Sequence, residues 1–333
     1  MQVNRRALLA GAASAASLTL LIVGLLALTN RQGQAPRAHV GPPKAHLLTS
    51  PFTGEPVPYL RRDLIFKIDN VPQARPPTGL KHADIVYLLP VDGGLSRIFA
   101  VFSSHIPPVV GPVRSARQED IELLRQFGKP ALAFSGAQPG LLPVVERARI
   151  VNLYAGTHNG YFRSANRIAP YNLYASTRQL LRQAPHASLA RDIGFRFGPP
   201  PPGGKPTTSY RVKYPAASFR FSWSAAQRGW LVGMDGAPAH DATGGRLGGP
   251  TLVIQYVRVT RSVFRERGIK PPFVNSVGSG IAVVLRNGRA YRVHWSRPNY
   301  GGGTRFTLPN GQRMPFARGQ VWVVFAYGRG STA

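Results

Sequence analysis

The chain contains no cysteine and few acidic residues. Without thiols it cannot form a disulfide, a thiolate metal site or a cysteine nucleophile. Its 13 Asp and Glu stand against 42 Lys and Arg, which gives a net charge of +29. This excess indicates an anionic partner, although a GC-rich coding bias toward arginine would explain it as well. The 43% hydrophobic content of the 333 residues is typical of a globular chain of about two domains.

One hydrophobic run is long enough to cross a membrane. Ala7–Leu28 carries no charge and follows Arg5 and Arg6, and a helix over it would span a hydrocarbon core of about 30 Å. We interpret residues 1–30 as an uncleaved signal anchor and residues 31–50 as a flexible spacer. A cleaved signal peptide and a twin-arginine export signal are open alternatives. All three interpretations place the body of the chain outside the cytoplasm, and the first predicts a single-pass protein of the cell membrane.

A stretch rich in proline and glycine, residues 199–206, divides the rest of the chain into two patterned regions. We expect a mixed α/β domain over 51–198, with a helix over Thr177–Gln183. Over 207–330 we expect a mostly antiparallel β-domain, because strand candidates such as Ser209–Tyr214 alternate with a period of two. The fold class is therefore α+β, preceded by one transmembrane helix. In the second region Asn287-Gly288 lies between two apolar runs, which predicts a β-hairpin. This region is also the more basic, with a net charge of +15 against +8 in the first.

The segment Gly111–Arg117 is the strongest candidate for a binding site. Ser115 and Gln118 predict a capping box that opens a helix at Ser115. Arg114 would then precede the helix and Arg117 would lie in its first turn, where free N–H groups and the helix dipole favour an anion. Two guanidinium groups there would bind a phosphate or carboxylate. The alternative is that one or both arginines pair with internal acids such as Asp92, Asp84 or Glu119.

Two further segments add candidate ligand-binding residues. In one, Asp92 precedes two glycines and Arg97 follows them, a pattern that fits either a close approach to a ligand or a strand-to-strand turn. The other segment, residues 157–172, mixes histidine, asparagine, arginine and aromatic residues, which is the composition of a binding rim. Its candidates are His158, Tyr161, Arg163, Arg167 and Asn172. A purely structural role is the competing interpretation for the histidine.

Known catalytic motifs are missing from the sequence. It has no His-Glu-x-x-His, no Gly-x-Ser-x-Gly, no Ser-x-x-Lys with its partner motifs, and no dinucleotide-binding glycine motif after a strand. We therefore expect no cofactor and no metal site. A glycosidase needs two carboxylates across a cleft, and the spacing of the acids selects no such pair. Whether the chain is an enzyme stays open.

Several short motifs, in their order along the chain, resemble the YerB-like family of bacterial extracytoplasmic proteins. The matching motifs are Ile68-Asp69-Asn70, Ala74-Arg75-Pro76, Ala83-Asp84-Ile85-Val86-Tyr87, Asp92-Gly93-Gly94, Ser96-Arg97, Gly111-Pro112-Val113-Arg114-Ser115-Ala116-Arg117, Gly160-Tyr161-Phe162-Arg163, Ala169-Pro170-Tyr171-Asn172-Leu173, Val277-Gly278-Ser279-Gly280, Arg286-Asn287-Gly288 and Gly319-Gln320-Val321-Trp322. The resemblance implies an exported, membrane-attached protein of two domains, often a lipoprotein, with no established activity. This chain departs from the family because it has no cysteine to carry a lipid. It also has Asp92 where the family pattern has Glu, and Asp69 where Glu or Asn is expected.

Three hypotheses for function follow. In the first, a membrane-tethered module binds a phosphate- or carboxylate-bearing component of the cell envelope, with residues 157–172 as the rim of its pocket. The residues lining that pocket would be Asp92, Arg97, Arg114, Ser115 and Arg117. The second is an envelope enzyme acting on a phosphodiester or glycan, with Asp92 or Asp69 as base. The third is a scaffold that docks a wall-associated protein on the basic β-domain, while export argues against nucleic acid as a partner. Arginines in an open cavity without a neighbouring carboxylate would favour binding over catalysis.

Overall fold

The computed structural model describes residues 47–265, 268–329 and 331. The predicted signal anchor and the predicted spacer up to residue 46 lie outside the described residues. Within the described part, no helix is both long enough and apolar enough to cross a membrane.

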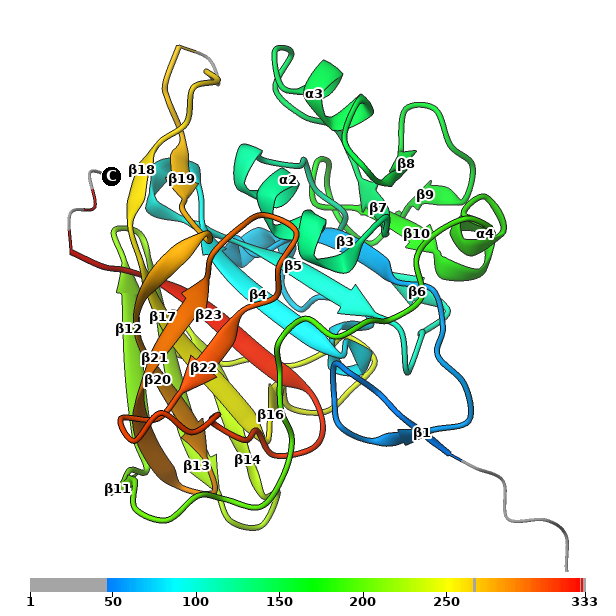
Figure 1. The fold of residues 1–333 in the computed structure, drawn as a ribbon. Helices are drawn as coiled ribbons and strands as arrows, with labels where there is room; N and C mark the ends of the chain where they lie inside the picture. Colours follow the sequence, from blue (N-terminus) through cyan, green and yellow to red (C-terminus); the bar gives the residue numbers. More distant parts are fainter. Residues whose placement is uncertain (1–46, 266–267, 330, 332–333) are drawn as a thin grey trace, which may run out of the picture. The chain divides into compact units, whose positions relative to one another are not determined.

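A mixed sheet of eleven strands, the main sheet, forms the centre of the part that the structure describes (Figure 1). In spatial order its strands are β11 (Lys205–Pro206), β21 (Arg289–Arg297), β20 (Gly278–Arg286), β17 (Thr251–Val257), β23 (Val321–Tyr327), β4 (Ile85–Pro90), β5 (Ser96–Phe102), β3 (Leu64–Asp69), β7 (Ala131–Phe134) and β8 (Val151–Tyr154), with β22 (Arg305–Thr307) paired to β21.

The last strand of the chain joins the two sequence regions. β23 pairs in parallel with β17 on one side and with β4 on the other, so strands from before and after the Pro/Gly stretch belong to one sheet. Val321–Ala326 is buried throughout, as expected for a strand covered on both faces. The boundaries that we predict for the two domains remain a prediction. The structure shows that both regions contribute strands to the main sheet.

A second, antiparallel sheet lies against the main sheet (Figure 1). Its strands are β12 (Ser209–Tyr214), β13 (Ala217–Ser224), β14 (Gly229–Met234), β15 (Ala237–Pro238) and β16 (Gly248–Gly249). In β12, Val212 and Tyr214 are buried while Arg211 and Lys213 are exposed, which confirms the predicted period of two. Three small sheets complete the strands: β1 (Leu48–Thr49) with β2 (Pro56–Val57), β6 (Val109–Val110) with β10 (Leu173–Ser176) and β9 (Tyr161–Arg163), and β18 (Val259–Arg261) with β19 (Pro272–Val274).

The predicted hairpin at Asn287-Gly288 is confirmed. Arg286 pairs directly with Arg289 across β20 and β21, which leaves a two-residue loop. Asn287 and Gly288 have φ values of 49° and 67°, the left-handed conformations that a type I′ turn requires at both positions.

Apolar side chains of the main sheet form a core on each of its faces. On one face Phe66 and Leu88 pack in a cluster with Phe221 and Trp230 of the second sheet. On the other face Ile65 and Phe99 pack in a cluster with Leu123 and Phe127. Leu123 lies in the last turn of the short helix α2 (Gln118–Leu124), and Phe127 follows that helix. The charged residues Lys67, Asp69 and Arg97 lie on this second face.

Three short α-helices are described: α2 (Gln118–Leu124), α3 (Leu142–Glu146) and α4 (Thr177–Arg182). The predicted helix over Thr177–Gln183 is confirmed to within a residue, whereas the predicted start of α2 at Ser115 is wrong. Arg117 is the N-cap, and the Asp120 carboxylate accepts its backbone N–H at 2.7 Å. Ala116 N–H instead donates to the carbonyl of Gly136, which holds Ser115 outside the helix. The acid at position 120 therefore closes the first turn, and the predicted Ser115–Gln118 box does not form.

Candidate functional site

Buried charged residues gather on the face of the main sheet that α2 covers. β3 has the sequence Leu-Ile-Phe-Lys-Ile-Asp, and side chains alternate between the faces of a strand. Lys67 and Asp69 therefore share the face of Ile65, beneath α2. Arg97 of β5 lies directly opposite Asp69 in the antiparallel register. The local pattern of two strands thus places three charged groups inside a largely apolar core, where each needs a partner.

The innermost pair is formed by Lys67 and Asp120. Lys67 Nζ lies 2.6 Å from Asp120 Oδ1, and both side chains are completely buried. Glu119 is buried beside them, and neither of its carboxyl oxygens has a hydrogen-bond partner among the described residues. Burial, and then the neighbouring Asp120 carboxylate, raise the pKa of Glu119 to about 7.

Arg117 is held by Asp92. The Arg117 Nη2 and Nε atoms lie 2.7 and 3.1 Å from Asp92 Oδ2, and Nη1 donates to the carbonyl of Ala116. The Arg117 side chain is 5% exposed and that of Asp92 is 28% exposed. Asp92 begins the turn between β4 and β5, where Gly93 and Gly94 have positive φ. Of the two interpretations of the Asp-Gly-Gly pattern, the structure has the strand-to-strand turn.

Arg97 is buried without a carboxylate within 4.0 Å among the described residues. Its Nη1 donates a long hydrogen bond of 3.5 Å to the carbonyl of Ser115, and its Nε has no partner in the same part of the chain. Burial lowers the pKa of Arg97 to about 10, and the positive charges of Arg117 and Arg114 act in the same direction. The group is still a cation at neutral pH.

Arg114 connects this buried network to the surface. Its Nε lies 2.9 Å from Asp69 Oδ2, and its side chain is 27% exposed while that of Asp69 is 2% exposed. The backbone of Arg114 donates to the carbonyl of Lys67 and accepts from Ser135. These two bonds fix the backbone of Arg114 between the ends of β3 and β7, and the ion pair with Asp69 positions its guanidinium.

A cavity of about 600 Å³, here called the Arg114 hollow, opens beside this residue. Its lining residues are Val113, Arg114, Ser115, Ser135, Tyr154, Ala155, Gly156, Tyr161, Phe162, Arg163, Pro170 and Leu173. Two of them are arginines from separate segments, and none is acidic. Arg163 is exposed, and its Nη1 donates to Asn172 Oδ1 at 2.7 Å. Tyr161 donates its hydroxyl to the carbonyl of Leu153, so this phenol is held in the wall.

The ten predicted site residues therefore fall into four groups. The hollow is lined by Arg114, Ser115, Tyr161 and Arg163. Asn172 belongs with them because its side chain accepts a hydrogen bond from Arg163. The three residues of the buried network are Asp92, Arg97 and Arg117. His158 hydrogen-bonds locally to Thr157 and to the carbonyl of Tyr154. Arg167 donates to the carbonyls of Ala74 and Pro76 at 2.6 and 2.7 Å, which ties residues 157–172 to another loop.

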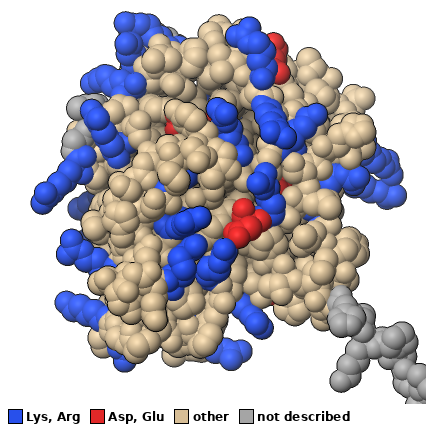
Figure 2. All heavy atoms as spheres, viewed as in Figure 1, with Lys and Arg blue, Asp and Glu red and all other residues tan. Residues whose placement is uncertain are grey.

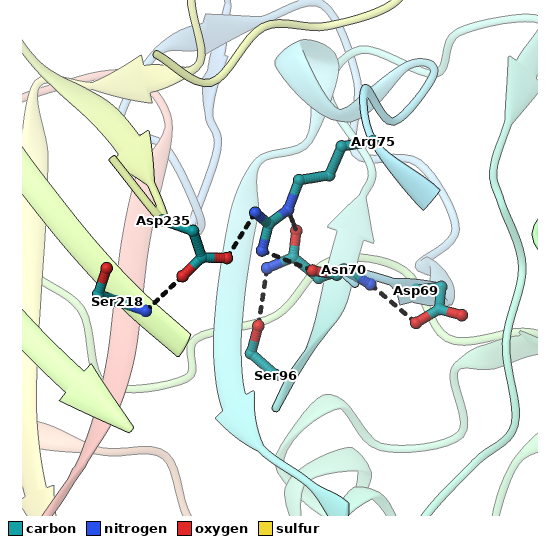
Figure 3. Close-up of polar contacts among 6 residues, drawn as sticks. All are labelled: Asp69, Asn70, Arg75, Ser96, Ser218 and Asp235. Carbon is teal, nitrogen blue, oxygen red and sulfur yellow. Dashed lines mark hydrogen bonds and ion pairs between the residues drawn. The ribbon is translucent and has the colours of Figure 1, made fainter. Parts of the chain in front are cut away.

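A second chain of polar contacts leads from Asp69 to the second sheet (Figure 3). Asn70 donates its backbone N–H to Asp69 Oδ1 and its side-chain amide to Ser96. Arg75 Nη2 donates to the carbonyl of Asn70 at 2.7 Å, and Nη1 lies 2.7 Å from Asp235 Oδ2. Asp235 in turn accepts the Ser218 N–H at 2.6 Å. Arg75 thus joins the turn between β14 and β15 to the end of β3.

Sequence reasoning missed the buried partners of this network. Lys67 is the single cation in an otherwise apolar stretch of β3, and that isolation was the available signal. Glu119 and Asp120 are the first acids of α2, but their burial depends on the packing of α2 against β3. Among the residues that the structure describes, no group of three or more His, Asp or Glu side chains could hold a metal ion.

Two family models match this chain. The model for the N-terminal domain of a protein of unknown function (DUF3048) matches residues 52–190, and the model for its C-terminal domain matches residues 210–323. The chain belongs to the DUF3048 family.

One relative supports the same assignment. The "Putative lipoprotein YerB" of Bacillus subtilis (strain 168) is 24% identical over 298 residues, which cover 85% of this chain and 87% of the relative. The crystal structure of the YerB protein from Bacillus subtilis matches with a TM-score of 0.72 at 22% identity, over 84% of this chain and 96% of that chain. The resemblance to the YerB-like family is thereby confirmed, and the structural match shows that the DUF3048 chain shares the fold of YerB.

Proposed function

We propose that this DUF3048 protein is a membrane-tethered, extracytoplasmic binding protein whose Arg114 hollow takes a phosphate- or carboxylate-bearing component of the cell envelope. The observation that carries the proposal is the pairing of Arg114 and Arg163 in one cavity with no acidic lining residue. Two guanidinium groups from separate segments can each present a fork of N–H donors to an anion.

The position of the buried network favours Arg114 and Arg163 over the other arginines as ligand contacts. Arg117 already has a carboxylate partner and is almost fully buried, and Arg97 is not a lining residue of the hollow. The charge of Arg117 is balanced by the Asp92 carboxylate, whereas Arg97 has no carboxylate partner among the described residues and adds positive charge behind Arg114 without reaching a ligand. The role that we assign to Arg97 is electrostatic support, since a fixed cation in a poorly solvated region acts over a longer range than one in water.

Binding is favoured over the envelope-enzyme alternative by the placement of the acids. Asp69 is 2% exposed and paired with Arg114, and Asp92 is paired with Arg117. Neither lines the Arg114 hollow. Asp69 lies next to Arg114 but is almost fully buried and engaged by its guanidinium, so neither carboxylate is presented to a substrate as a base. The scaffold alternative rests on the basic charge of the second region, which would have to form a docking surface. Figure 2 gives it no support, because Lys and Arg are spread over the visible face and are not gathered in one patch.

The membrane tether is supported by the sequence and by the relative. The relative is named as a lipoprotein, whereas this chain has no cysteine to which a lipid could be attached. The apolar run Ala7–Leu28 would supply the anchor in its place.

The test compares the full chain with the variant Arg163→Glu. Arg163 is exposed and outside the buried ion pairs, so its replacement should leave the fold intact. The matched control is Arg211→Glu, an exposed arginine on β12 with the same change of charge. The probes are poly(glycerol phosphate), polygalacturonate as the carboxylate polymer, and dextran as the neutral polymer.

We expect the full chain to bind at least one of the two anionic polymers in preference to dextran. Reversal of charge at Arg163 should weaken that binding at least about tenfold, because two or more charge-assisted hydrogen bonds are replaced by repulsion. The Arg211 variant should bind within about twofold of wild type. Equal losses in the two variants would show that net charge, and not the hollow, governs binding, and would overturn the proposal.

A further inference from the structure

We propose a second binding site, for a phosphorylated sugar, in a cavity at the end of the main sheet. This strand-end hollow has a volume of about 970 Å³, within the range of pockets that enclose small organic ligands. The residues that carry the proposal are Tyr256, Arg258, Ser279, Ile281, Arg292 and Trp295. The site does not depend on the Arg114 hollow, with which it shares no lining residue.

The sheet itself builds this cavity. β17 and β23 run in parallel and end together, with Val257 paired to Tyr327, while β20 begins at the same edge with Gly278-Ser279-Gly280. A Cβ atom at Gly280 would lie 2.8 Å from Trp295 Nε1 and 3.3 Å from the carbonyl of Tyr256. The absence of a side chain therefore lets Trp295 donate its indole N–H to that carbonyl, at 2.9 Å. The floor of the hollow is fixed before any ligand binds.

Aromatic and aliphatic groups supply an apolar surface within the hollow. Tyr256 is half-buried, and its hydroxyl lies 3.0 Å from that of Tyr210, which fixes the ring. Ile281 is 40% exposed although it lies inside a nine-residue strand. Tyr327, also in the lining, is half-buried and packs edge-on against Tyr214. An inorganic anion would make no use of these groups, whereas a sugar ring packs well on an apolar and aromatic surface.

Arginines surround this apolar surface. Arg258 follows β17, Arg292 lies on β21, and Arg329 follows β23; all three are exposed lining residues. The lining contains no acid, so no carboxylate within it competes for the guanidinium groups. The Ser279 hydroxyl is exposed at the start of β20 and adds a neutral donor and acceptor suited to a sugar hydroxyl. An apolar surface, a hydroxyl and a cationic rim in one cavity match a ring that carries a phosphate.

The experiment measures binding to the full chain by isothermal titration calorimetry. The three probes are N-acetylglucosamine 1-phosphate, N-acetylglucosamine and inorganic phosphate, which separate the ring from the anion. We expect the sugar phosphate to bind at least about tenfold more tightly than either of the other two. If inorganic phosphate bound as tightly as the sugar phosphate, binding would reflect only the general attraction of a basic protein for anions. That result would overturn the proposal.

Two variants locate the site. Arg258→Ala/Arg292→Ala removes two exposed cations, and Ser279→Phe fills the cavity from an exposed position without a change of charge. Both should weaken sugar phosphate binding at least about tenfold and keep the thermal unfolding temperature of wild type. The matched control Arg178→Ala/Arg182→Ala removes two exposed cations from α4 and should bind as wild type does.

Three outcomes would contradict the assignment. They are no binding of the sugar phosphate at millimolar concentrations, full binding by the Ser279→Phe variant, or equal losses in the two double arginine variants. The Arg163→Glu variant should retain sugar phosphate binding, so a failure of the Arg114 hollow can be told apart from a failure of the strand-end hollow.

Discussion

Lys67 and Asp120 form an ion pair of 2.6 Å in which both side chains are completely buried. The pair joins the centre of β3 to the first turn of α2, and the same carboxyl group accepts the backbone N–H of Arg117. Asp120 therefore compensates the charge of Lys67 and caps α2 at the same time. The start of α2 and the position of Arg117 both depend on this contact.

Replacement of Lys67 by Met should be strongly destabilising. It leaves the Asp120 carboxylate buried without its cation, which costs about 3–5 kcal/mol of unfolding free energy. The measurement is urea unfolding of the full chain. In Lys67→Met/Asp120→Leu no unpaired charge remains, so this variant should recover most of the loss, apart from about 1 kcal/mol for the missing cap. If the unfolding free energy of Lys67→Met lay within about 1 kcal/mol of that of wild type, the ion pair would contribute little to stability.

Glu119 should make stability fall as pH rises. Its pKa is raised from 4.5 to about 7 in the folded protein, so between these values the folded chain holds a proton that the unfolded chain releases. The contribution is fully present below pH 4.5 and is lost as pH rises through 7. We expect Glu119→Gln to match wild type near pH 4 and to exceed its unfolding free energy by on the order of 3 kcal/mol at pH 8. Asp192→Asn is the control, because that carboxyl group is exposed and its pKa is lowered; parallel pH profiles for wild type and Glu119→Gln would contradict the assignment.

Arg75 should contribute to stability through Asn70 as well as through Asp235. Its ion pair with Asp235 is partly exposed, at 18% and 32% for the two side chains, and such pairs contribute less than about 1 kcal/mol. The hydrogen bond to the Asn70 carbonyl is an additional charge-assisted contact. We expect Arg75→Ala to lower the unfolding free energy by about 1–3 kcal/mol, and Asp235→Asn, which keeps an acceptor for Ser218, to lower it by less. The reverse order in urea unfolding would place the main contribution in the ion pair.

Arg167 should act on the loop and not on the ligand. Its guanidinium donates to the carbonyls of Ala74 and Pro76, so Arg167→Ala should increase amide hydrogen exchange in residues 164–172. Exchange in β3 and β5 should stay unchanged. The same variant should bind the anionic polymer within about twofold of wild type. A loss of binding as large as that of Arg163→Glu would contradict this prediction and place Arg167 among the ligand contacts.

The sequence predicted the strands well because their signals are local. The period of two in Ser209–Tyr214 and the Asn287-Gly288 turn both depend on neighbouring residues, and both are confirmed. The start of α2 was predicted wrongly because its first turn is closed by Asp120, the third helical residue, and not by Ser115. Lys67 holds the Asp120 carboxyl group in place, and Lys67 is 53 residues away along the chain.

The candidate site shows the same division. The sequence alone determined the family resemblance, the basic charge and four of the residues that line the Arg114 hollow, because each depends on residue identity or on a short motif. Only the tertiary structure decided that Arg117 is paired with Asp92 and that Arg114 reaches the surface. A guanidinium has the same chemistry in either place, and its burial and its partners come from strands and loops that are distant in sequence.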